Sequence, residues 1–248
     1  MGVHDAPQWL ISTFVRSTLS AGATAPPGTV EDVGQQLLER WSSPDRCFHN
    51  LRHLADMLTR VDELVEETHE PDLVRLAAWY HGAVFDSAER ASYAGRGGED
   101  ERAGAALART ELSGLGVPDA AVARVVELIE TLERHTPDTD DFDSAVLCDA
   151  DLAMLAAEPQ RYKSYLADLR AEYAHIPTEE FVRARIAILH RLAERSRLFS
   201  SPLGAAWEEA ARQNLAAELH RLEKELGKIE KARAESEPEA DRSARSMA

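Results

Sequence analysis

Apolar residues recur at helical spacing along almost the whole chain. Val33, Leu37 and Leu38, for example, share one helix face with Trp41 in the segment that begins at Val30. No segment shows the sustained apolar–polar alternation that predicts a β-strand. After this first segment, 30–41, the sequence predicts helices over residues 44–67, 71–81, 100–115, 118–135, 144–156, 159–175, 178–196 and 202–226.

Breaks in the pattern mark helix ends and loops. Ser42, Ser43 and Pro44 predict a helix start with a serine cap and a proline in the first turn. Three glycines predict a flexible loop over residues 86–100, and the acidic stretch 136–143 predicts another loop. The predicted fold class is therefore all-α, a single-domain helical bundle.

The length of 248 residues suits one domain, and 44% hydrophobic residues are enough to form a core. We expect residues 1–29 to hold an N-terminal segment with a first helix, and residues 30–226 to form the helical domain. Residues 227–248 mix charges with alanine and serine, so we expect a disordered tail there.

Composition limits the cellular location and the classes of binding partner that we expect. No apolar run approaches the about 20 residues that cross a membrane, and no secretory signal opens the sequence. We therefore expect a cytoplasmic protein, and the two cysteines, which lack metal-site spacing, are expected to be reduced. The net charge of −16 argues against a nucleic-acid polymer as partner, but not against a small phosphorylated molecule.

Histidines supply the first candidate chemistry. His49 and His53 are spaced to lie on one face of a helix, within reach of one ion or substrate. This spacing arises often by chance, and the alternative for His53 is a core histidine with one hydrogen bond. His81 ends an apolar helical run, where it could line a pocket or interact with the helix dipole.

Two aspartates, Asp149 and Asp151, lie in an otherwise apolar predicted helix between Leu147 and Leu152. Burying two carboxylates without compensation is costly. A cation could compensate them, as could a helix N-terminus or an arginine. The pair therefore favours a metal site without requiring one.

Taken in order, these segments resemble the HD-domain superfamily of metal-dependent phosphohydrolases, and in particular a bacterial subgroup of predicted HD phosphohydrolases. The resemblance covers residues 30–225 and implies the helical bundle of that superfamily. It rests on the following matches: Arg46-x-Phe48-His49-Asn50-x-x-His53, Ala77-Ala78-Trp79-Tyr80-His81, Asp100-Glu101, Thr131-x-x-x-His135, Asp149-Ala150-Asp151-Leu152, Arg170-Ala171-Glu172-Tyr173 and Ala210-Ala211-Arg212-Gln213-Asn214-Leu215.

The resemblance implies that His53, His81 and Asp151 bind a divalent metal ion, for which Mn, Fe, Zn, Co and Ni all suit such ligands. It implies that Asp149 lies behind these ligands or accepts hydrogen bonds at a helix cap. The residues that it places around the pocket, in contact with substrate or with the attacking water, are Glu101, His49 and His135. Its candidates for phosphate contacts are Arg46, Arg52 and Arg185.

Gly82 departs from the pattern. The family has at this position the aspartate of its name-giving pair, which binds metal and assists the attacking water. Glycine can do neither, although Asp86 could approach the metal if its loop folds inward. Two histidines and one carboxylate would bind metal more weakly, but three protein ligands can hold a catalytic zinc.

The resemblance implies a metal-dependent phosphohydrolase that acts on a nucleotide or another small phosphoester and is impaired or rewired at Gly82. The alternative is a catalytically inactive HD-like module that binds a nucleotide or a protein. A third explanation is an incidental substitution, since one base change converts an aspartate codon to a glycine codon. A homodimer is compatible with the sequence, but no heptad seam specifies one.

Overall fold

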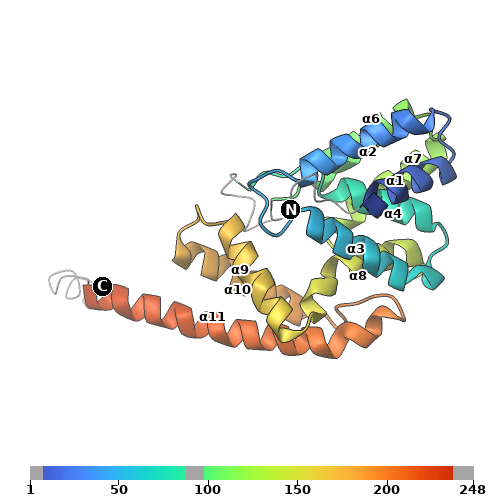
Figure 1. Ribbon diagram of the computed structural model, residues 1–248. Helices are drawn as coiled ribbons and strands as arrows, with labels where there is room; N and C mark the ends of the chain where they lie inside the picture. The colour runs from blue at the N-terminus through green and yellow to red at the C-terminus, as the bar shows by residue number, and fades with distance from the viewer. Residues whose placement is uncertain (1–7, 88–97, 237–248) are drawn as a thin grey trace, which may run out of the picture.

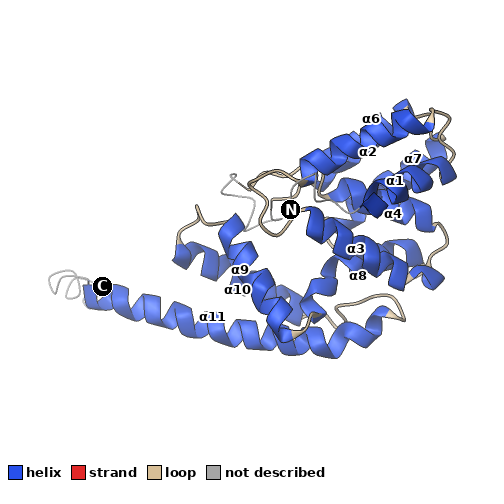
Figure 2. Ribbon diagram, in the orientation of Figure 1, coloured by secondary structure: helices blue, strands red, loops and turns tan. Residues whose placement is uncertain are grey.

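The computed structural model describes residues 8–87 and 98–236. Within these ranges the protein is all-helical, as predicted, with loops and an isolated β-bridge joining the helices (Figure 2). The α-helices are α1 (Gln8–Ser20), α2 (Pro27–Trp41), α3 (Leu51–Glu63), α4 (Pro71–His81), α6 (Glu101–Gly114), α7 (Asp119–Leu132), α8 (Phe142–Leu152), α9 (Pro159–Glu172), α10 (Thr178–Ala193) and α11 (Glu208–Ser236). The 3₁₀ helices are η2 (Val65–Glu67), η3 (Ala153–Ala156) and η4 (Gly204–Trp207).

Helices α1 to α8 enclose one hydrophobic core (Figure 1). Helix α4 lies at its centre, since it packs against α1, α3, α6, α7 and α8. Every residue from Leu76 to His81 is buried. A helix that is apolar on all sides is stable only inside a core. The burial of α4 thus carries His81, its last residue, into the interior.

A second core lies among η3, α9, α10 and α11, with α11 running along one edge of the molecule (Figure 1). A buried ion pair joins two of these helices, because Nε of Arg185 on α10 lies 2.8 Å from Oε1 of Glu218 on α11. Tyr162 on α9 donates a hydrogen bond to the same carboxylate. Trp207 packs against both cores, so it lies at their junction.

The predicted helix start at Ser42–Pro44 is wrong, because α3 begins only at Leu51. Asn50 is the cap: its side chain accepts a hydrogen bond from the backbone amide of Arg52 at 2.8 Å. Residues 42–50 form a loop instead. The backbone amides of residues 47–49 in this loop donate hydrogen bonds to Glu172 of the second core. His49 therefore precedes the helix that carries His53.

The predicted disordered tail is wrong for residues 227–236, because α11 continues to Ser236. Alanine, glutamate, lysine and arginine are strong helix formers, so a segment whose one large apolar residue is Ile229 can remain helical. Glu230 also lies 2.7 Å from Arg183 on α10. Residues 88–97 of the predicted loop and 237–248 of the tail lie outside the described residues. Among the described helices, none is both long and apolar enough to cross a membrane.

Candidate metal centre

Three helices bring the predicted metal ligands together. His53 comes from α3, His81 from the end of α4 and Asp151 from the end of α8, and these helices pack against one another. The imidazole centroids of His53 and His81 are 5.7 Å apart. Oδ1 of Asp151 lies 3.3 Å from Nε2 of His53 and 3.8 Å from Nε2 of His81. Residues that are up to 98 positions apart in sequence thus present three donor atoms to one point.

His81 has the tautomer that a metal ligand needs. Its Nδ1 lies 2.7 Å from the carbonyl oxygen of Ala78, an acceptor only, so Nδ1 carries the proton. Nε2 is then left with its lone pair directed at His53 and Asp151. Burial lowers the pKa of His81, although nearby carboxylates oppose this effect, so the ring is neutral at pH 7.

A fourth donor, Glu99, was not predicted from the sequence. The bridge between Phe85 and Glu99 pairs the segments on either side of the loop. It is reinforced by hydrogen bonds from the Asp86 amide to Gly98 at 2.7 Å and from the Asp100 amide to Val84 at 3.1 Å. This pairing directs Oε1 of Glu99 to within 3.4 Å of Nε2 of His81.

Glu99 and Trp41 occupy the space beside Gly82. A Cβ atom at position 82 would lie 2.6 Å from Oε1 of Glu99 and 2.4 Å from Cη2 of Trp41. The indole is fixed in this place, since its Nε1 donates a hydrogen bond to the carbonyl of Trp79 at 2.9 Å. Glycine fits here because any side chain would overlap these two groups.

Three atoms of this cluster are buried without a hydrogen-bond partner: Nε2 of His53, Nε2 of His81 and Oε1 of Glu99. The potential ligand atoms of these residues all lie within 4.8 Å of one another. Buried polar atoms without partners are rare because each costs about 1–3 kcal/mol. Imidazole and carboxylate donors that converge in this way fit a divalent cation, which would satisfy all three.

His135 fixes the position of Asp151. Its Nε2 lies 2.7 Å from Oδ2 of Asp151, the oxygen that does not face His81. Its backbone has a φ of 49°, a strained value for a residue with a side chain. Nη1 of Arg195 donates to its carbonyl at 3.2 Å, which helps to hold this conformation. Burial opposes ionisation of Asp151, but the hydrogen bond from His135 and the nearby His53 ring hold its pKa well below the usual value.

His49 lies beside the cluster, held by Glu172 from α9. Oε2 of Glu172 accepts hydrogen bonds from the amides of Cys47, Phe48 and His49 at 2.9–3.0 Å. Oε1 of the same carboxylate lies 2.5 Å from Nδ1 of His49. Burial would lower the pKa of His49, but Glu99 and Glu172 together raise it to about 9. Glu172 is thus a second residue without a predicted role that shapes the site.

Glu101 lies in the first turn of α6, two residues after Glu99, and is 7% exposed. Burial raises its pKa to about 7, and repulsion from Glu99 and Asp151 adds to this effect. Asp86, the other predicted carboxylate, is exposed, and its backbone amide donates a hydrogen bond to Gly98 beside the β-bridge. Of the carboxylates of Asp86 and Glu99, that of Glu99 approaches His81, with Oε1 at 3.4 Å from Nε2.

Asp149 binds a different part of the chain from the predicted metal ligands. Its oxygens accept hydrogen bonds from the amides of Ser200 at 2.7 Å and Ser201 at 2.8 Å. A Cβ at Gly204 would lie only 2.4 Å from Oδ2 of Asp149, so this loop packs closely against the carboxylate. Asp149 therefore fixes the loop before η4.

The predicted phosphate-binding arginines are dispersed. Arg46 is buried and donates to the carbonyls of His49 at 3.0 Å and Gly82 at 2.8 Å. Its guanidinium thus supports the backbone behind the site, and burial lowers its pKa to about 10. Arg185 belongs to the second core, as described above. Arg52 is exposed and lies next to His53 in sequence.

A search of protein-family models found no match to the chain, and a search of curated proteins found none either. Membership of the HD superfamily therefore remains a prediction from the sequence motifs.

Proposed function

We propose that this protein is a metal-dependent phosphohydrolase of HD type, acting on a nucleotide or another small phosphoester. One divalent ion would be held by His53, His81, Asp151 and Glu99. The observation that carries this proposal is the convergence of three buried, unpartnered donor atoms on one point. With Glu99 included, the ligand set has two imidazoles and two carboxylates, and it needs no side chain at position 82.

When bound, a divalent ion lowers the pKa of a coordinated water and polarises a phosphoryl oxygen. The protein's own groups complete the chemistry. Glu101 supplies a carboxylate beside the cluster that can accept a proton from the attacking water. His49 can donate a proton from Nε2 or offset negative charge that develops on the phosphoryl group. His135 keeps Asp151 oriented through its 2.7 Å contact.

Elemental analysis of the purified, untagged protein tests the proposal, with His53→Ala as the matched variant. We expect near-stoichiometric metal in the wild type and a loss of that metal in His53→Ala. A screen of phosphoesters with the metal found would then give turnover that chelators abolish. Absence of metal after incubation with Mn or Zn would overturn the proposal.

The inactive binding module has a different signature in the same experiments. It would bind a nucleotide or a protein without turnover, and chelators would leave that binding unchanged. Because metal content and turnover are measured separately, the two functions can be distinguished.

A further inference from the structure

Two small cavities open beside the proposed metal ligands. One has a volume of about 20 Å³ and is bordered by Asp151, and the other has a volume of about 50 Å³ and is bordered by Tyr165. The residues that border both cavities are His53, Asp56, Met154 and Arg161. Any molecule that reaches His53 from either cavity therefore meets these shared side chains.

Asp56 and Arg161 form an ion pair at this shared border. Asp56 lies one turn after His53 on α3, and Arg161 lies in the first turn of α9. Their side chains are 31% and 46% exposed, so the pair is accessible to solvent. A partly exposed ion pair of this kind contributes little to stability, so an incoming anion can replace its carboxylate at small cost.

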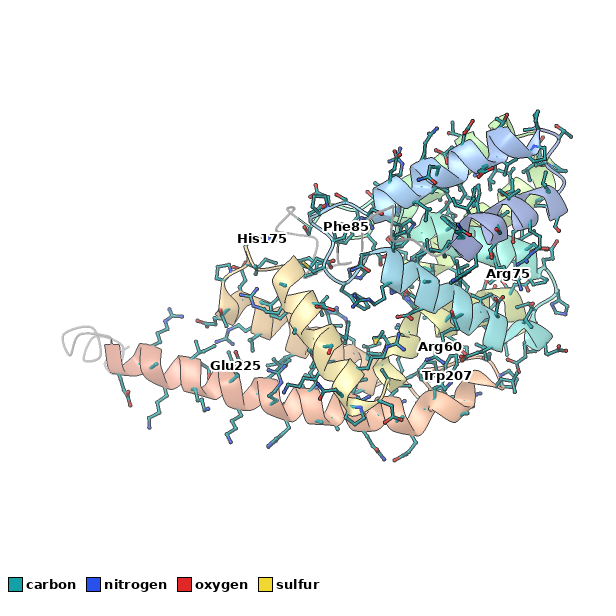
Figure 3. The ribbon with its side chains drawn as sticks, viewed as in Figure 1. Arg60, Arg75, Phe85, His175, Trp207 and Glu225 are labelled. Carbon is teal, nitrogen blue, oxygen red and sulfur yellow. The ribbon has the colours of Figure 1, made fainter. Side chains whose placement is uncertain are left out.

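The other arginines near the site have competing partners or a less central position. Arg46 and Arg185 are buried and bonded within the protein. Arg60 borders only the smaller cavity, pairs with Glu63 at 2.5 Å and lies over the Trp207 ring at 5.5 Å (Figure 3). Arg52 borders only the larger cavity.

We propose that Arg161 binds the phosphate group of the substrate and that Asp56 holds its guanidinium until the phosphate arrives. This proposal rests on the proposed function and assigns the substrate-binding cation of that site. The planar guanidinium can form two parallel hydrogen bonds with a carboxylate or with a phosphate. The first turn of α9 adds a favourable helix dipole for an anion. The cluster itself is rich in carboxylates, so a dianionic group needs a cation besides the metal.

Calorimetric titration of inorganic phosphate into the Mn-incubated, full-length protein tests the proposal. The variants are Arg161→Gln, Asp56→Asn and the control Arg183→Gln, which removes an arginine of 49% exposure that is paired at a distance from the site. We expect Arg161→Gln to weaken phosphate binding about tenfold or more, because a charge-assisted contact is lost. We expect Asp56→Asn to strengthen it about threefold, since the competing carboxylate is neutralised.

Equal phosphate affinity in Arg161→Gln and Arg183→Gln would overturn the assignment of Arg161, as would a wild type that binds no phosphate. Metal content, measured on the same samples, separates this failure from failure of the proposed function. Normal metal content with no effect of Arg161→Gln would reject Arg161 alone. Absence of metal with a clear effect of Arg161→Gln would reject the metal site and leave the anion site standing.

Discussion

The carboxylate of Glu99 lies where a side chain at position 82 would begin, since a Cβ at Gly82 would be 2.6 Å from Oε1 of Glu99. The two positions are 17 residues apart in sequence, and only one of them can present a carboxylate to His81. The glycine is thus compatible with a complete ligand set that is supplied from a different segment.

Gly82→Asp is expected to damage the site, although the family pattern alone would suggest a gain. The new side chain overlaps Trp41 and Glu99, and overpacking of this kind costs about 1–3 kcal/mol. The midpoint temperature of thermal unfolding and the metal content should both decrease. Gly28→Asp is the control, because a Cβ at Gly28 meets nothing within 4 Å. A rise in metal content in Gly82→Asp would contradict this account.

Glu99→Ala should lose metal in a protein that remains folded. Substitution of a residue that only orients a metal ligand typically lowers metal affinity about 10–100-fold. Removal of a direct ligand should therefore lower metal affinity by more than about 100-fold. Competition with a chelator measures the affinity. Glu127→Ala, which removes a carboxylate of 66% exposure on α7, should behave like the wild type. Equal affinities in both variants would exclude Glu99 from the ligand set.

Substitutions of Asp149 and Asp151, which both lie on α8, should have opposite effects. Asp149→Ala leaves the amides of Ser200 and Ser201 without acceptors, which should cost about 3 kcal/mol of stability while metal binding persists. Asp151→Ala should abolish metal binding. Chemical denaturation together with metal analysis of both variants tests this assignment, and a reversal of the two phenotypes would reject it.

Glu101→Gln should lower kcat about 10²–10⁴-fold on any phosphoester that the protein hydrolyses, because a proton acceptor is removed. Metal content should be unchanged, since Glu101 is outside the ligand set. Steady-state kinetics gives kcat and KM, and metal analysis of the same sample gives the metal content. A large change in KM with kcat preserved would assign Glu101 to substrate binding instead.

Asp141 should contribute stability that depends on pH. Burial opposes its ionisation, but hydrogen bonds from Arg124 and Ser144 lower its pKa to about 2. A lowered native pKa stabilises the fold above the unfolded value of about 4, and this contribution disappears as the pH falls towards about 2. Asp141→Asn, which keeps the helix cap, should lose about 1–2 kcal/mol at pH 7. The difference between the two proteins in urea unfolding should disappear near pH 2.

The sequence was sufficient to predict the all-helical class and to place those residues whose position follows from helix periodicity. His53, His81 and Asp151 lie near helix ends or on inward faces, so a pattern of motifs can identify them. Glu99 could not be found in this way, because its approach to His81 depends on pairing between residues 84–86 and 98–100. The sole sequence signal was its place in the acidic run from Glu99 to Glu101.

Long-range contacts explain the other differences. The loop before α3 could not be predicted locally, because its amides are satisfied by Glu172, 123–125 residues away. The arginines predicted to bind phosphate were chosen by residue type alone. Two of them, Arg46 and Arg185, are buried and bind other groups of the protein instead. Helix α11 extended beyond its last large apolar residue because propensity and a contact with α10 support it.

The bond between Glu172 and His49 also sets an order of assembly. All four proposed ligands lie within the first 151 residues, and the core formed by α1 to α8 spans the same part of the chain. During synthesis this portion leaves the ribosome before α9 exists, and domains generally fold from the N-terminal side. The nascent chain would thus have its ligands in place while His49 still lacked its anchor. Under the proposed function, metal binding would therefore precede catalytic competence, which would begin only once residue 172 had emerged.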